Sequence, residues 1–188
     1  MAKEHKLGLY VGRFQGLHNG HCSAIDILSR KCERVLVLIG SAQESNTTRN
    51  PYDAETRTHI LNMVYGDNKN VKIASLVDYT DENDICVEWG DYLLRTVRII
   101  MGEFPDAMIS SGDDITGWFE PHIDNQIAKI YLDRDMSATE LRKAIAVGNM
   151  DKVREMTHSA IHDELWDLRR KLLEVPYYSE INENYIRG

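Results

Sequence analysis

The sequence predicts a doubly wound α/β fold, in which a parallel sheet of about five strands is followed by a helical C-terminal region. Short apolar runs rich in β-branched residues recur along the first two thirds of the chain, each suited to a strand buried on both faces. Helical patterns separate these runs, so right-handed crossovers should join parallel strands. A ligand would then bind at the carboxyl ends of the strands.

Each element follows from this alternation. The expected strands cover residues 7–11, 35–39, 71–76, 107–110 and 127–132. The expected helices between them cover about 20–31, 53–65 and 87–101, and later helices cover 137–147, 151–156 and 161–174, before a polar tail that begins at Pro176. We therefore expect a single domain over residues 1–188, with a core at about 7–148 and a helical extension at about 149–188.

Composition excludes several classes of protein. The formal net charge is −8, which disfavours a protein that holds a nucleic-acid backbone, because that role needs an extended basic face. Apolar runs are too short to cross a bilayer, and residues 1–6 lack the apolar core of a signal peptide. We expect a cytoplasmic protein with neither nucleic acid nor membrane as a partner.

Three cysteines, Cys22, Cys32 and Cys86, form no CxxC pair, and their odd number argues against a disulfide framework. They are expected to be free thiols in the core. Zinc is disfavoured as well, because His18 and His21 with Cys22 lack a clear further ligand.

The turn after the first expected strand reads Gly-Arg-Phe-Gln-Gly-Leu-His-Asn-Gly-His over residues 12–21. A strand that ends in a glycine-rich turn and opens a helix directs backbone N–H groups and the positive end of the helix dipole at one point, where a phosphate binds. His18 and His21 can donate hydrogen bonds to phosphate oxygens there. Taken alone, the His-Asn-Gly-His tetrapeptide also fits a helix start with a partly satisfied core histidine.

Three further segments follow in order: Gly-Ser-Ala-Gln-Glu-Ser-Asn-Thr at 40–47, Asn-Pro-Tyr at 50–52 and Ser-Ala-Thr-Glu-Leu-Arg at 137–142. With these four motifs the chain resembles the HxGH nucleotidyltransferase superfamily and, within it, the nicotinamide mononucleotide adenylyltransferases of the archaeal and phage type. The resemblance covers about residues 7–148. It implies a Rossmann-like fold and an enzyme that makes NAD⁺ and pyrophosphate from nicotinamide mononucleotide (NMN) and ATP.

The resemblance also implies site residues. The catalytic group would be His18, His21, Arg13 and Arg142. ATP would be bound by Gly12, Arg13, Phe14, His18, Gly20, His21, Ser111, Gly112, Asp113, Ser137, Thr139 and Arg142. The mononucleotide would be bound by Ser41, Gln43, Ser45, Thr47, Arg49, Asn50, Arg57, Asn83, Trp89 and Trp118.

Some of these residues have a second interpretation. Ser137 with Glu140 forms a capping box that any helix start could carry. Arg142, one turn into that helix, favours an anion as ligand, because its guanidinium can reach the same anion as the free amides of the helix start. Arg57 could instead form a surface ion pair with Asp53, an expected helix N-cap, or with Glu55.

The base pocket has two rival tryptophans. Trp89 or Trp118 could stack on the nicotinamide ring, and either could instead belong to the core. Asn83 resembles the asparagine of the family's loop, although its spacing to Trp89 is looser than the family's. Gly16 stands where the family commonly has proline, which should loosen the phosphate turn.

Mg²⁺ is the expected ion, held mainly by ATP phosphates and not by a protein cage. Two alternatives for function remain open. The acceptor could be nicotinate mononucleotide, FMN or a phosphopantetheine, or the chain could be a non-catalytic nucleotide-binding regulator. The tail, with Tyr177, Tyr178 and Tyr185, could cover a neighbouring subunit in a homo-oligomer.

Overall fold

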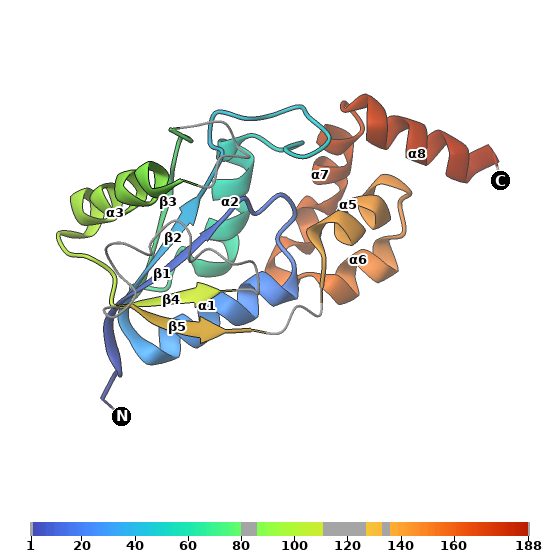
Figure 1. Cartoon of the computed structure of the whole chain (residues 1–188). Coiled ribbons are helices and arrows are strands. Elements are labelled where there is room, and N and C mark those ends of the chain that lie inside the picture. Colours follow the sequence, from blue (N-terminus) through green and yellow to red (C-terminus); the bar gives the residue numbers. More distant parts are fainter. Residues whose placement is uncertain (1, 80–85, 111–126, 133–135, 188) are drawn as a thin grey trace.

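A parallel sheet organises the chain, with the strand order β3-β2-β1-β4-β5 (Figure 1). The computed structural model describes residues 2–79, 86–110, 127–132 and 136–187. Its strands are β1 (His5–Gly12), β2 (Cys32–Ile39), β3 (Val71–Ser75), β4 (Ala107–Ser110) and β5 (Ala128–Tyr131). The expected doubly wound α/β fold is confirmed.

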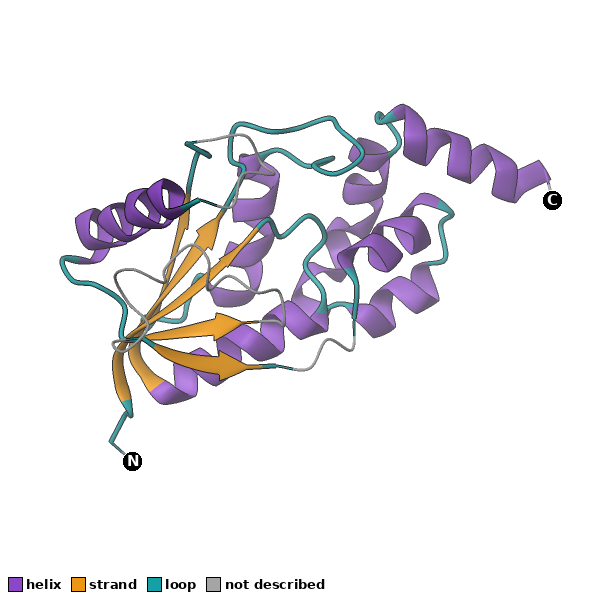
Figure 2. Cartoon of the chain, in the orientation of Figure 1, coloured by secondary structure: helices purple, strands orange, loops and turns teal. Residues whose placement is uncertain are grey.

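Helices cover both faces of the sheet (Figure 2). The crossover helices are α1 (Asn19–Lys31), α2 (Ala54–Tyr65) and α3 (Val87–Met101). The C-terminal elements are α5 (Ala138–Ala146), α6 (Met150–Met156), the 3₁₀ helix η2 (Ser159–Glu164), α7 (Leu165–Leu172) and α8 (Pro176–Arg187). The helix expected at 161–174 is therefore a 3₁₀ turn followed by a shorter α-helix.

Alternation along the central strands divides the core in two. In β2, Leu36 and Leu38 pack with α3, whereas Val35, Val37 and Ile39 belong to the larger cluster that α1, α2 and the C-terminal helices cover. Successive side chains of a strand point to opposite faces, so a strand buried on both sides must be apolar throughout. This explains why the sequence reads as uninterrupted apolar runs.

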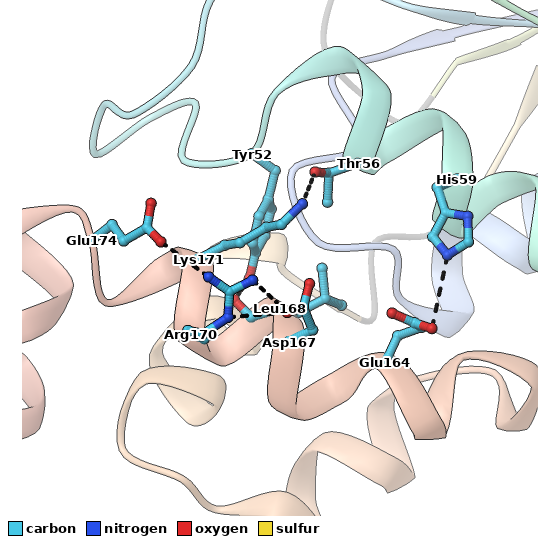
Figure 3. A network of polar contacts seen from close by, with 9 residues as sticks. All are labelled: Tyr52, Thr56, His59, Glu164, Asp167, Leu168, Arg170, Lys171 and Glu174. Atoms are coloured by element: carbon cyan, nitrogen blue, oxygen red, sulfur yellow. Dashed lines mark hydrogen bonds and ion pairs between the residues drawn. The ribbon is translucent and has the colours of Figure 1, made fainter.

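The C-terminal helices are fastened to α2 by polar contacts (Figure 3). Lys171 Nζ donates to Thr56 Oγ1 at 2.8 Å, and the buried Tyr52 hydroxyl donates to the carbonyl of Leu168 at 3.2 Å. His59 and Glu164 approach to 3.8 Å at the other end of the contact. Residues of α7 thus contribute to the same core as the sheet.

The polar segment that begins at Pro176 continues the helical extension expected at about 149–188. It forms α8, whose first turn starts on proline, a residue suited to the first helical position because its missing N–H is not needed there. Tyr178 is 1% exposed and packs inside its own chain, whereas Tyr185 is 63% exposed. Only the exposed tyrosines remain available for a neighbouring subunit.

Across the residues that the structure describes, we find no helix with the length and apolar content needed to span a bilayer. All three cysteines are free thiols, as expected, and Cys22 and Cys32 are buried. Burial raises the pKa of each of these two thiols to about 11, so both stay protonated.

Candidate active site

The candidate site lies at the carboxyl edge of the sheet, where β1 separates β2 on one side from β4 on the other. The chain connections diverge at this point, which is where open α/β sheets bind ligands. The amide of Gly40, just after β2, donates to the carbonyl of Gly12 at the end of β1 over 2.9 Å. The loops that follow the two strands are therefore joined at their base.

The turn between β1 and α1 depends on Gly16. Its φ of +107° is rarely adopted by residues with a side chain, and proline, fixed near −65°, cannot adopt it. A Cβ at Gly16 would lie 3.3 Å from a methyl carbon of Leu141 in α5. The glycine thus permits both the turn and its close approach to α5, which explains the departure from the family's proline.

His18 is the N-cap of α1, and His21 lies in the first turn, which holds no acidic residue. Their rings stack, with centroids 3.7 Å apart and planes inclined by 24°. Nδ1 of His21 accepts the backbone N–H of His18 at 3.4 Å, which favours a proton on Nε2. Burial lowers the pKa of His18 to about 4, so its imidazole is neutral near pH 7.

One imidazole nitrogen of this pair is buried without a partner. His18 Nδ1 makes no hydrogen bond among the described residues, and a Cβ on Gly20 would lie 3.0 Å from it. A larger residue at position 20 would crowd this nitrogen. An unsatisfied buried polar atom at a helix N-terminus is the expected state of a ligand site.

Phe14 was predicted to contact ATP, and its ring lies instead in the core. It is 3% exposed, meets Tyr10 edge to face at 5.2 Å and lies 5.2 Å from the ring of His21. Any ATP contact of Phe14 would have to use its backbone. In the structure the Phe14 ring packs against the ring of His21.

The N-terminus of α5 faces the same turn. The Cβ of Met136 would lie 3.8 Å from a Cβ at Gly20, which places the starts of α1 and α5 side by side. Ser137 caps α5, because its Oγ accepts the amide of Thr139 at 3.2 Å, in place of the Glu140 amide that the expected capping box would use. Two helix N-termini therefore approach one another at the edge of the sheet.

Arg142 is 8% exposed and reaches back from α5 to the β1–α1 turn. Its Nη1 donates to the carbonyl of Gln15 at 2.7 Å, its Nη2 to Thr139 Oγ1 at 3.2 Å, and its Nε to the Tyr178 hydroxyl at 2.6 Å. All three partners are neutral oxygens. No carboxylate among the described residues is paired with this buried guanidinium, so its charge can act on an anionic ligand.

The loop after β2 folds back on itself. Thr47 N donates to the Asn50 carbonyl at 3.2 Å, and Thr47 Oγ1 accepts the Asn50 amide at 2.9 Å, which closes a tight turn. Of the residues predicted to bind the mononucleotide, Ser41 and Asn50 are buried, Ser45 is half-buried, and Gln43, Thr47 and Arg49 are exposed.

Two side chains fix the start of this loop to the segment that follows β3. Asp78 Oδ1 accepts the amide of Ser41 at 3.3 Å, and Gln43 Oε1 accepts the amide of Asp78 at 3.0 Å. Asp53, at the far end of the loop, caps α2 as predicted by accepting the amide of Thr56 at 2.7 Å. The loop therefore has two fixed ends and an exposed middle.

Arg57 does not form the surface ion pair that was its alternative interpretation. It is 2% exposed, and its guanidinium donates to the carbonyls of Arg13, Gly40, Ser41 and Asp53 over 2.8–3.1 Å. Burial lowers its pKa to about 10, which leaves it charged near pH 7. Arg57 thus holds together the ends of β1 and β2 and the start of α2, and half-buried Arg13 is held through its backbone.

Gln15 is a structural residue of the site that sequence reasoning did not single out. Its buried side chain pairs with the backbone of Tyr52, donating to the carbonyl and accepting the amide at 2.9 Å each, while its own carbonyl accepts from Arg142. An amide side chain that pairs with both backbone groups resembles a strand contact, and no local periodicity reveals it.

Trp89 lies in the first turn of α3 and is 8% exposed, packed with Leu7, Leu9 and Leu93 in the smaller core cluster. This placement favours its core interpretation. The remaining predicted site residues lie outside the described residues: Asn83, Ser111, Gly112, Asp113 and Trp118.

The side chains gathered at this edge suit anions. Within the described ranges, no three His, Cys, Asp or Glu side chains come together in a way that could hold a metal ion. The groups that can face a ligand are two imidazoles, the guanidinium of Arg142 and two helix N-termini, which stabilise negative charge. The arrangement can bind phosphates and stabilise charge that develops on them.

Residues 9–144 match the family described as cytidylyltransferase-like. The chain belongs to this nucleotidyltransferase family. It is 31% identical over 144 residues to the nicotinamide-nucleotide adenylyltransferase of Thermococcus onnurineus, a match that covers 76% of this chain and 74% of the relative. The chain is thus a relative of the archaeal nicotinamide-nucleotide adenylyltransferases, as its motifs indicate.

The fold is also that of known enzymes of this kind. A bifunctional NMN adenylyltransferase/ADP-ribose pyrophosphatase from Francisella tularensis superposes with a TM-score of 0.71 at 21% identity, over 97% of this chain. The chain spans 54% of the length of that protein. A second structure of the F. tularensis protein, complexed with AMP and a manganese ion, superposes with a TM-score of 0.68 at 21% identity, over the same shares of the two chains.

Proposed function

We propose that the chain transfers the adenylyl group of ATP to NMN, which yields NAD⁺ and pyrophosphate. The observation that carries the proposal is the pair of helix N-termini at the carboxyl edge of the sheet, one with His18 and His21 and the other with Arg142. Its T. onnurineus relative is named for this reaction, and that relative aligns with three quarters of the chain.

The reaction needs little acid–base chemistry from the protein. An oxygen of the NMN phosphate attacks the α-phosphorus of ATP, the bond from that phosphorus to the bridging oxygen breaks, and pyrophosphate leaves with that oxygen. The attacking phosphate is already an anion, so no base must remove a proton. The protein's task is to bring two polyanions together and to stabilise the charge that grows on the equatorial oxygens and the leaving group.

His21 is proposed to donate to the α-phosphate. Its Nδ1 accepts the amide of His18, so Nε2 carries the proton that a phosphate oxygen needs. His18 and Arg142 would serve the outer phosphates, with Ser137, Thr139 and the free amides of α5 beside them. Because His18 is neutral, its single ring proton must sit on the nitrogen that faces the ligand.

The mononucleotide would lie against the loop at 41–50. Ser41, Gln43, Ser45, Thr47, Arg49 and Asn50 remain the proposed contacts, and Arg57 would act by fixing the carbonyls beneath them. The exposed side chains in the middle of the loop, those of Thr47 and Arg49, would face the substrate. Asn83, Trp89 and Trp118 remain the proposed contacts of the base.

Mg²⁺ is proposed to enter as part of the substrate, Mg-ATP. The described donor groups are cationic or neutral N–H groups, which fit phosphate oxygens and not a cation, so the ion would be held mainly by the phosphates. Bound there, it would offset charge on the leaving pyrophosphate. The three free thiols fit a reducing compartment, and we propose a cytoplasmic location.

A direct assay tests the proposal. Purified protein is incubated with Mg-ATP and, in turn, NMN, nicotinate mononucleotide, FMN and phosphopantetheine, and pyrophosphate and the dinucleotide are measured. We expect NAD⁺ with NMN. Arg142→Gln should lose most of the activity, whereas Lys143→Gln, which removes the exposed charge next along α5, should retain it. Absence of pyrophosphate with every acceptor would leave a nucleotide-binding regulator as the better account.

A further inference from the structure

The hydroxyl of Tyr178 joins two parts of the site that the sequence does not connect. It accepts a hydrogen bond from Arg142 Nε at 2.6 Å and donates one to the carbonyl of Thr48 at 2.8 Å. The three residues come from α8, α5 and the loop after β2. One buried hydroxyl in the C-terminal helix therefore bridges the phosphate-facing arginine and the mononucleotide loop.

The bond to Arg142 decides which N–H groups the arginine can offer. A guanidinium has five N–H groups in one plane, and three are used, by Tyr178, Gln15 and Thr139. No described residue accepts a hydrogen bond from the remaining two, one on each terminal nitrogen, and these can face a ligand. Because Nε is held by Tyr178, the plane of the guanidinium is fixed and those two groups keep one direction.

The bond to Thr48 acts on the loop. Thr48 is exposed and lies within the turn that Thr47 and Asn50 close, and the carbonyl of Thr48 is bound by a residue 130 positions later in the chain. Tyr178 itself is 1% exposed, at the start of α8, and its backbone amide binds the carbonyl of Val175. A rigid, buried group thus holds an otherwise exposed turn.

We propose that Tyr178 is a positioning residue that couples the phosphate-binding arginine to the mononucleotide loop. Its single hydroxyl proton must point at Thr48, because Arg142 occupies its acceptor side. A phosphate that draws on the Arg142 guanidinium would strengthen this chain of hydrogen bonds, since successive bonds polarise one another. Nucleotide bound at α5 would then stabilise the loop before the mononucleotide arrives.

Hydrogen exchange tests this coupling without turnover. Exchange of the peptide that covers residues 44–52 is followed by mass spectrometry, with and without saturating α,β-methylene-ATP and Mg²⁺. We expect the nucleotide to slow exchange in the wild type and to leave it nearly unchanged in Tyr178→Phe. Protection that persists in Tyr178→Phe, or that is missing in the wild type, would overturn the coupling.

Kinetics provide the second readout, which rests on the proposed function. Loss of one hydrogen bond to a charged group predicts a fall of about 10-fold to 100-fold in kcat/KM for Tyr178→Phe. Tyr177→Phe, the exposed neighbour on the same helix, should behave as wild type. Tyr65→Phe, which also loses a buried tyrosine hydroxyl, should lower the melting temperature at least as much as Tyr178→Phe, with wild-type kinetics.

The two experiments separate the possible failures. Normal kinetics and retained loop protection in a folded Tyr178→Phe protein would show that the hydroxyl is only structural. If Tyr178→Phe does not fold, Arg142→Lys replaces it, because lysine keeps the charge but cannot reach Tyr178 with a fixed fork, and the same loss of loop protection is expected at saturating nucleotide. If the wild type forms no pyrophosphate, the exchange experiment still decides the coupling.

Discussion

The imidazole rings of His18 and His21 stack with their centroids 3.7 Å apart at the start of α1. Two charged rings at this distance would repel each other, and the burial of His18 keeps that ring neutral. The pair can thus present ring N–H donors to a phosphate without both rings carrying charge. A bound polyphosphate would offset the cost of protonating His18, so nucleotide binding should raise the pKa of His18.

This arrangement predicts how stability depends on pH. The pKa of His18 is about 4 in the folded chain and about 6.5 in the unfolded chain, so the unfolded state takes up the proton first. The stability that the chain retains with His18 neutral is fully present above pH 6.5. It is lost as the pH falls toward 4, because the unfolded chain binds the proton more readily than the folded chain. We expect the wild type to lose about 1 kcal/mol per pH unit more than His18→Gln in this window.

Denaturant unfolding at several pH values measures the difference, and ring resonances from NMR report the pKa directly. His158→Gln, which removes an exposed histidine that caps η2, is the control. Parallel stability profiles for the wild type and His18→Gln would contradict the neutral, buried state of His18.

Gly16 provides a test of the phosphate turn. Gly16→Pro cannot reach a φ of +107° and should lower the free energy of unfolding by more than about 1 kcal/mol. It should also raise the KM for ATP, because the turn carries Gln15, the partner of Arg142. Gly16→Ala should cost more than Gly102→Ala, which has the same sign of φ but no atom within 4 Å of the added Cβ.

Thermal unfolding of the wild type, Gly16→Pro, Gly16→Ala and Gly102→Ala measures these differences in stability. A Gly16→Pro protein that is more stable than the wild type would mean that the turn can take a conformation compatible with the family's proline.

Trp89 is the predicted base-pocket residue that lies within the described part of the chain, and its ring is buried in the core. Because its ring is packed among leucines on the α3 face, Trp89→Ala should lower the free energy of unfolding by about 3–5 kcal/mol. Trp166→Ala, which removes a 60% exposed ring, should change it by less than about 0.5 kcal/mol. A stable Trp89→Ala protein with a raised KM for NMN alone would restore the stacking role.

The fold was predictable because its signals are local. Strands buried on both faces require continuous apolar runs, and the limits expected for β4 and α3 coincide with those observed. The segment after Pro176 was expected to be a polar tail of the helical extension, because most residues of α8 are exposed. A single buried residue, Tyr178, gives no helical periodicity, and its contacts lie 36 and 130 residues away.

The site was predictable as a set of motifs but not as a set of contacts. The motif identified Arg57 and Arg142 as cations one turn into a helix, which is where the structure has them. It could not show that Arg57 donates its hydrogen bonds to four backbone carbonyls, since those carbonyls come together only in the folded chain. Gln15 was overlooked for the same reason.

The proposed reaction requires the histidines to act as hydrogen-bond donors to phosphate. His21→Ala should lower kcat by about 10²-fold to 10³-fold, the range for loss of one preorganised donor, with a smaller change in ATP affinity. Asparagine at this position could still donate to a phosphate oxygen, and its carbonyl oxygen could accept the amide of His18.

The most direct test is therefore the kcat of His21→Asn against that of His21→Ala, measured as NAD⁺ formed from NMN and Mg-ATP, with folding checked by circular dichroism. If the residue at position 21 acts by donating a hydrogen bond, His21→Asn retains clearly more activity than His21→Ala. Equal loss of kcat in two folded variants would contradict this donor role and would point to proton transfer by His21.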